Sequence, residues 1–112
     1  MRVVEFRTYK LRSGAGPTFA RLAVEESLPM CREWGMDVVS FGQSVHDPDA
    51  CYLIRAFDSL EHLQRQQDEF YGSSAWREGP REAIVGLIES DANAVIELSE
   101  DAIQALRRGS RT

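Results

Sequence analysis

The sequence predicts an α+β domain with the order β-α-β-β-α-β, in which helices cover one face of an antiparallel sheet. Three observations lead to this prediction. Two β-forming runs, residues 36–45 and 51–57, flank a turn and predict a hairpin. One helical pattern precedes the hairpin and another follows it. A further β-forming run lies near each end of the chain, at residues 3–11 and 88–98, so the order is typical of a ferredoxin-like fold.

The first strand, residues 3–11, has two faces of different character. One face carries Val4, Phe6 and Thr8, and the other carries Glu5, Arg7 and Tyr9. Pro17 then stands where the first turn of a helix tolerates proline. This helix is expected to bury apolar residues at helical spacing: Phe19, Leu22, Ala23 and Met30. Pro29 predicts an interruption of its last turns.

Turn chemistry at residues 46–49 joins the two hairpin strands. Asp58 and Glu61 then predict a capping box at the start of the second helix. The buried stripe of this helix is Leu60, Leu63, Gln67 and Phe70. A further helical stretch contains Trp76 and restarts at Pro80.

The chain continues beyond the last strand of this pattern. Ser99 is a helix cap, and a short helix with Arg107 and Arg108 at its negative end is expected to stop at Gly109. We therefore expect a single domain over residues 1–112, with a core at about 3–98 and a C-terminal helix and tail over 99–112.

Composition excludes several classes of partner. The 112 residues include 13 Lys and Arg against 18 Asp and Glu, a net charge of -5, and the basic cluster is Arg107, Arg108 and Arg111. We therefore expect no nucleic-acid partner, because such proteins need a basic surface. No apolar run approaches the ~20 residues that cross a bilayer. We expect no membrane partner and a cytoplasmic location.

Cofactor and metal motifs are also missing from the sequence. Cys31 and Cys51 are expected to be reduced and unpaired, and His46 with Asp49 would supply too few metal ligands. There is no glycine-rich phosphate loop, paired-cysteine zinc motif or Gly-x-Ser-x-Gly elbow. The sequence predicts neither a metal nor a cofactor.

A single sheet with helices on one side leaves a second face that is polar or is covered by another subunit. We expect that face to carry Glu5, Arg7 and Tyr9, with Arg55 of the neighbouring strand on the same side. Two guanidinium groups repel unless an acid or a ligand lies between them. We therefore expect Arg7 to pair with Glu5 or with another acid such as Asp91. Arg55 is then the freer donor for the acid group of a ligand.

Each of these candidates also has a purely structural interpretation. Arg7 and Arg55 are suited to interior ion pairs as well as to anion binding, and Tyr9 to a half-buried strand position. Trp76 either anchors its helix to the sheet or stacks on a ligand at the mouth of a cavity. The sequence leaves these alternatives open.

Several separated motifs together resemble the NIPSNAP family. They are Glu5-x-Arg7-x-Tyr9-x-Leu11, Gly14-x-Gly16-Pro17-x-Phe19, Glu25-Glu26-x-Leu28-Pro29, Ala56-Phe57-Asp58-Ser59-Leu60, Arg65, and Trp76 ahead of Pro80. The resemblance covers residues 3 to 98 and implies a dimeric α/β barrel, in which two ferredoxin-like sheets close face to face. It implies no agreed reaction. On the third strand, where family members usually carry His, an aromatic residue and Tyr, this chain has Leu53, Arg55 and Phe57. A function that depends on that His is not carried over.

Two functions follow from these observations. The first is a NIPSNAP-like homodimer of unassigned function that binds a small, acidic molecule in its barrel cavity. Its candidate site is Glu5, Arg7, Tyr9, Arg55 and Trp76. The alternative is a cofactor-independent enzyme, similar to the monooxygenases and isomerases of this superfamily, that acts on a small organic acid or aromatic compound. In that case Tyr9 or Glu5 would move a proton.

Overall fold

The computed structural model describes residues 1–110 and places four strands in one antiparallel sheet. The strands are β1 (Arg2–Leu11), β2 (Asp37–Gln43), β3 (Ala50–Phe57) and β4 (Ile88–Leu98). Their order across the sheet is β2-β3-β1-β4. The first and third strands therefore lie side by side in the middle of the sheet, and the ferredoxin-like α+β fold is confirmed.

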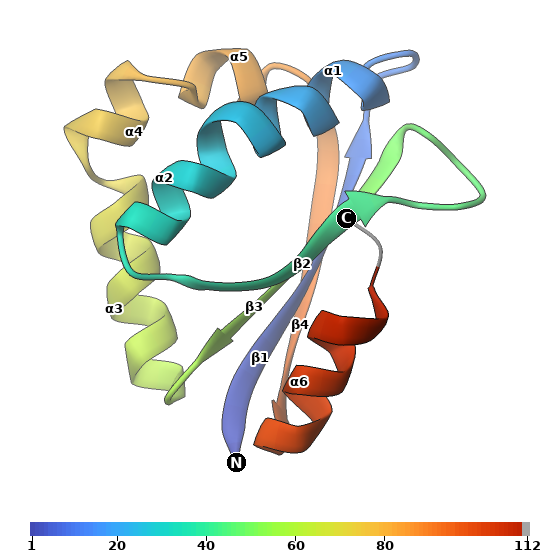
Figure 1. Ribbon diagram of the computed structural model, residues 1–112. Coiled ribbons are helices and arrows are strands. Elements are labelled where there is room, and N and C mark those ends of the chain that lie inside the picture. The colour runs from blue at the N-terminus through green and yellow to red at the C-terminus, as the bar shows by residue number, and fades with distance from the viewer. Residues whose placement is uncertain (111–112) are drawn as a thin grey trace.

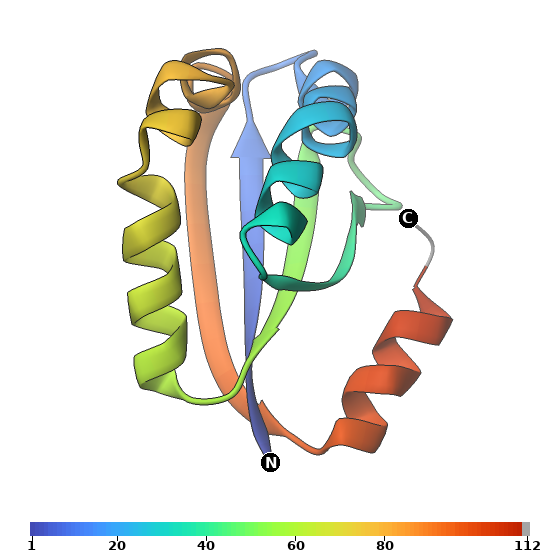
Figure 2. The same cartoon turned by 60° about the vertical axis from the view of Figure 1, so that its left-hand side comes forward.

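Six helical segments between the strands pack on one face of this sheet (Figures 1 and 2). They are α1 (Gly16–Leu22), the π-helical η1 (Ala23–Ser27), α2 (Leu28–Glu33), α3 (Leu60–Tyr71), α4 (Ser74–Glu78) and α5 (Arg81–Val85). The interruption predicted near Pro29 is the wider turn of η1, because proline cannot donate a backbone hydrogen bond to the preceding turn. No helix of the described residues is long and apolar enough to cross a membrane.

The start of α1 depends on a turn that requires glycine. The carboxylate of Asp49 accepts hydrogen bonds from the backbone N–H groups of Gly14 and Gly16, each at 2.8 Å. Gly14 has a φ of +81°, and a Cβ atom on Gly16 would collide with the backbone oxygen of Pro48. The Gly-x-Gly-Pro motif thus ties the hairpin loop to the first helix.

The start of α3 differs from the predicted capping box. Ser59, rather than Asp58, is the N-cap, and its Oγ accepts the backbone N–H of His62 at 3.0 Å. Asp58 instead uses its backbone N–H, which donates to Nδ1 of His62 at 3.0 Å. The cap lies one residue later because Ser59 is the last residue with an extended backbone.

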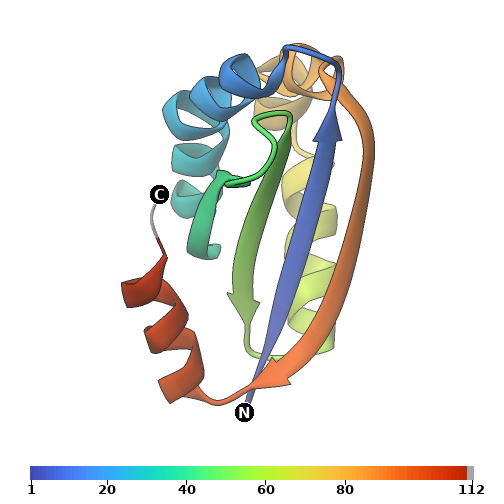
Figure 3. The same cartoon turned by 90° about the vertical axis from the view of Figure 1, so that its right-hand side faces the viewer.

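Each face of the sheet has its own apolar cluster. The larger cluster lies under α1 to α5 and includes Phe19, Leu28, Phe41, Leu53, Phe70 and Trp76. The smaller cluster lies on the opposite face and consists of Val4, Val39, Ile54, Ala56 and Ile103. Figure 3 shows this opposite face, with the sheet in front of the helices that cover its other side.

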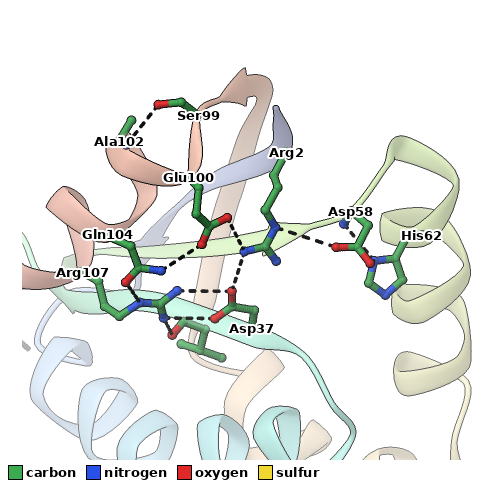
Figure 4. Close-up of polar contacts among 10 residues, drawn as sticks. Arg2, Asp37, Asp58, His62, Ser99, Glu100, Ala102, Gln104 and Arg107 are labelled. Carbon is green, nitrogen blue, oxygen red and sulfur yellow. Dashed lines mark hydrogen bonds and ion pairs between the residues drawn. The ribbon is translucent and has the colours of Figure 1, made fainter.

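The helix α6 (Glu100–Gly109) covers one end of the opposite face (Figure 3). Its Ile103 is fully buried in the smaller cluster, and Ser99 caps the helix as predicted. Arg107 donates to both carboxylate oxygens of Asp37, at 3.0 and 3.2 Å (Figure 4). Arg2 joins this group through Asp37 at 3.1 Å, so charged groups hold α6 against β2. Arg111, the third member of the basic cluster, lies outside the described residues.

The predicted assignment of the two faces of β1 was wrong. Val4 lies in the smaller cluster and Phe6 packs against it, whereas Tyr9 packs in the cluster beneath the helices. Alternation along a strand fixes which residues share a face, but it does not fix which face the helices cover. Glu5, Arg7 and Tyr9 therefore face the helices of their own chain.

Candidate functional site

A cavity of about 540 Å³ lies between the sheet and the helices of the single chain. Its aromatic lining is Tyr9, Phe19, Phe41, Phe70, Tyr71 and Trp76. Its charged lining is Arg7, Arg81 and Asp91, a net charge of one positive in a chain of net charge -5. The volume is within the range of small-molecule sites, ~300–1,000 Å³. The cavity can thus hold an apolar ring together with one anionic group.

A buried ion pair lies behind this cavity. Glu5 on β1 and Arg55 on β3 stand directly opposite each other in the sheet, and both are 0% exposed. Arg55 donates to Oε1 of Glu5 from Nη2 at 2.8 Å and from Nε at 3.2 Å. Two such buried charges are tolerable because they neutralise each other at short range.

Further donors complete the hydrogen bonding of Glu5. Its Oε2 accepts from Arg7 Nη2 at 2.9 Å and from Asn93 Nδ2 at 3.1 Å, and its Oε1 also accepts from Gln67 Nε2 at 3.0 Å. Burial alone raises the pKa of a carboxyl group, but Arg55, Arg7 and Asn93 outweigh burial and lower the pKa of Glu5 to about 2. Glu5 is therefore ionised at neutral pH.

Arg55 is not the free donor that the sequence predicted. Its third nitrogen, Nη1, donates to the hydroxyl oxygen of Tyr71 at 3.0 Å and lies 3.6 Å from Sδ of Met36. The guanidinium is enclosed by Glu5, Tyr71 and Met36, and Arg55 is absent from the lining of the cavity. Its role is to hold Glu5 and Tyr71 in place.

Of the two arginines that the sequence singled out, Arg7 is the one that lines the cavity. Its pairing with Glu5 confirms the expected ion pair, but in the described part of the chain its Nε is a buried donor with no hydrogen-bond partner. Burial lowers the pKa of Arg7, but Tyr9, Glu5 and Tyr71 raise it and the net shift is upward. Arg7 stays charged and retains donor capacity.

Tyr9 lies beside Arg7 in the cavity wall. Its ring packs on Phe19 with the ring centroids 5.0 Å apart. Burial raises the pKa of Tyr9, Tyr71 raises it further, and the opposing effect of Arg7 is smaller. Tyr9 therefore keeps its proton at neutral pH.

Trp76 fits both of the interpretations left open by the sequence. It is 7% exposed, and its ring lies 5.5 Å from Phe70 and 5.4 Å from Tyr71, centroid to centroid. It therefore anchors α4 in the core, and it also lines the cavity.

The two cysteines are free and buried, and His46 is exposed in its turn. Cys31 lines the cavity, where burial raises the pKa of its thiol despite the nearby Arg55. Burial, together with Asp49, also raises the pKa of Cys51, to about 11. Both sulfur atoms are thiols rather than thiolates at neutral pH.

The candidate residues from the sequence thus divide into two groups. Arg7, Tyr9 and Trp76 line the cavity. Glu5 and Arg55 do not line it, but they form hydrogen bonds to two residues that do, Arg7 and Tyr71. Sequence reasoning missed Tyr71, which lines the cavity and bonds to Arg55. Helical spacing could have indicated Tyr71, because it follows Gln67 of the predicted buried stripe by four residues and so lies on the same face of α3.

Comparison with solved structures supports the fold. A NIPSNAP family protein from Agrobacterium tumefaciens has a TM-score of 0.80 and 18% identity, with 92% of this chain and 90% of that chain covered. An uncharacterized NIPSNAP-like domain protein from Burkholderia xenovorans has a TM-score of 0.79 and 20% identity, with 88% and 86% covered. A proposed antibiotic biosynthesis monooxygenase from Nitrosomonas europaea has a TM-score of 0.67 and 13% identity, with 88% and 91% covered.

These neighbours confirm, at the level of the fold, the resemblance to the NIPSNAP family that the sequence motifs predicted. The sequence matches no protein-family model, and no curated protein matches it.

Proposed function

We propose that the chain is a NIPSNAP-like domain that forms a homodimer and binds a small organic acid in the cavity of each subunit. The observation that supports this most directly is the state of Arg7. It is a charged side chain in an aromatic cavity, fixed by Glu5 and with an unused buried donor on Nε. An anionic group of a ligand would satisfy a guanidinium in this position.

Replacing Arg7 tests the proposal. The probe is 2-naphthoate, a bicyclic carboxylate, and its affinity is measured by isothermal titration calorimetry. Arg7→Gln is expected to weaken binding at least tenfold, because a charged hydrogen bond contributes ~1.5–3 kcal/mol. Arg21→Gln is the matched control, since Arg21 is exposed on α1 and pairs only locally with Glu25 among the described residues. Equal affinity of the Arg7 variant, with its circular dichroism unchanged, would contradict the proposal.

The enzyme alternative has one observation in its favour, the fold shared with the Nitrosomonas protein. Its proposed proton carriers do not suit the role at neutral pH. Glu5 has a pKa of about 2 with both oxygens occupied, and the pKa of Tyr9 is raised by burial. General acid–base catalysis is most efficient when the pKa lies near the working pH. Binding is therefore the function we favour.

The homodimer is proposed from the sheet face that α6 leaves uncovered. This open face consists of side chains on β1 and β4: Phe6, Thr8, Ala92, Ala94 and Ile96. Ile96 is 46% exposed although it is a large apolar residue. Water contact with such a face is unfavourable, and a second copy of the sheet would remove it. A stable interface there should bury more than ~1,000 Å² in total.

A charge placed in the middle of the open face should prevent dimerisation. The native chain, of 12.7 kDa, is expected to sediment as a dimer of about twice that mass at micromolar concentration. Ala94→Arg is expected to convert it to a monomer, because Ala94 lies opposite Phe6 in the centre of the face. Ala75→Arg, at an exposed site on α4, serves as the control and should remain dimeric. A native monomer in analytical ultracentrifugation would refute the homodimer.

A further inference from the structure

The hydroxyl group of Tyr71 has its direction of hydrogen bonding fixed by Arg55. Among the described residues, the hydrogen bond of this hydroxyl is the one it accepts from Nη1 of Arg55, at 3.0 Å. A guanidinium has no acceptor, so the proton of Tyr71 cannot be used in that bond. Tyr71 must therefore offer its proton elsewhere, and it lines the cavity.

The ring that carries this hydroxyl is fixed on several sides. Phe70 and Trp76 pack against it edge to face, with centroid distances of 5.0 and 5.4 Å. The guanidinium carbon of Arg55 lies 5.8 Å from the ring centroid, which is a cation–π distance. Ordering the donor in advance lowers the entropy that a ligand loses on binding.

Arg7 provides a second donor in the same cavity. Arg7 is charged, whereas Tyr71 is neutral. Each is held by one member of the buried ion pair, since Arg7 donates to Glu5 and Tyr71 accepts from Arg55. The two donors therefore differ in charge and in strength. A carboxylate, with two acceptor oxygens, can use one donor on each oxygen.

We propose that the cavity recognises an aromatic carboxylate, with the carboxylate bound between the guanidinium of Arg7 and the hydroxyl of Tyr71. This inference rests on the proposed function and adds to it the ligand class and the second recognition residue. The aromatic part follows from the rings of Phe19, Phe41, Phe70 and Trp76 in the cavity wall.

The charge of the lining favours a carboxylate over a phosphate. Arg7, Arg81 and Asp91 are the charged residues of the lining, and Arg7 also pairs with the ionised Glu5 at 2.9 Å. One net positive charge balances a singly charged carboxylate. A phosphate monoester dianion would leave a second negative charge near Asp91 and Glu5.

Calorimetry with matched probes tests the inference. The native protein is expected to bind 2-naphthoate at least tenfold more tightly than the neutral 2-naphthamide and than 2-naphthyl phosphate. Tyr71→Phe should weaken binding of 2-naphthoate about tenfold and leave that of 2-methylnaphthalene unchanged. Tyr52→Phe, which removes a hydroxyl from the other face of the sheet, should bind like the native protein.

The outcomes separate this inference from the proposed function. Loss of binding in Arg7→Gln with full binding in Tyr71→Phe would overturn the role of Tyr71 and leave the proposed function standing. Equal or tighter binding of the phosphate would overturn the carboxylate class. Failure of the native protein to bind any of the anions would overturn both. If Tyr71→Phe does not fold, a crystal structure of the native complex decides, because a carboxylate out of hydrogen-bond distance of Tyr71 refutes the inference.

Discussion

Replacing Arg55 with leucine is expected to lower the free energy of unfolding by about 3–5 kcal/mol, the usual cost of removing one partner from a buried ion pair. Arg55 is 0% exposed and supplies Oε1 of Glu5 with bonds of 2.8 and 3.2 Å. Leucine would leave Glu5 with fewer donors, and Tyr71 without its bond from Arg55. Urea denaturation at fixed protein concentration measures the change.

Two comparisons make this expectation specific. Arg65→Leu removes an exposed arginine from α3 and should change stability by no more than ~0.5 kcal/mol. The double variant Glu5→Leu, Arg55→Leu should lose less unfolding free energy than the sum of the losses of the two single variants. In the double variant neither charge of the Glu5–Arg55 pair is left buried without the other. An Arg55→Leu protein as stable as the native one would show that the ion pair does not stabilise the fold.

This expectation reverses what the sequence predicted for Arg55. Alternation along the strands correctly placed Glu5, Arg7 and Arg55 on one side of the sheet. Alternation does not show which side of the sheet the helices cover. The prediction therefore placed these three residues on the open face, whereas in the structure they face the helices. Which arginine is enclosed also depends on residues remote in sequence. Met36 and Tyr71 contact Arg55, and no local sequence pattern predicts those contacts.

Local chemistry predicted other features well. The order of strands and helices along the chain, the interruption at Pro29 and the cap at Ser99 follow from turn residues, proline and capping preferences, which act within a few positions. The cavity does not follow from such rules. It is formed where the helical segments from α1 to α5 meet the sheet, and its volume depends on side chains from all of them. A site of this kind is a property of packing, and alternation or helical spacing can identify only its individual members.

Acid should remove part of the stability of this protein through Glu5. Its pKa is about 2 in the folded chain against an ordinary value of 4.5, so the folded state favours the ionised form. The contribution to stability is complete above pH 4.5 and is lost as the pH falls toward 2. For a shift of this size, the loss is on the order of 3 kcal/mol.

The variant Glu5→Gln isolates that contribution. It should be less stable than the native protein at pH 7, because the guanidinium groups of Arg55 and Arg7 lose their common carboxylate. Since glutamine does not titrate, the difference in unfolding free energy between the two proteins should narrow by about 3 kcal/mol from pH 5 to pH 2. Glu69→Gln, at an exposed site on α3, should follow the native curve throughout. A difference that stays constant with pH would show that Glu5 has the same pKa in the folded and the unfolded chain, and that its ion pairs do not lower this pKa on folding.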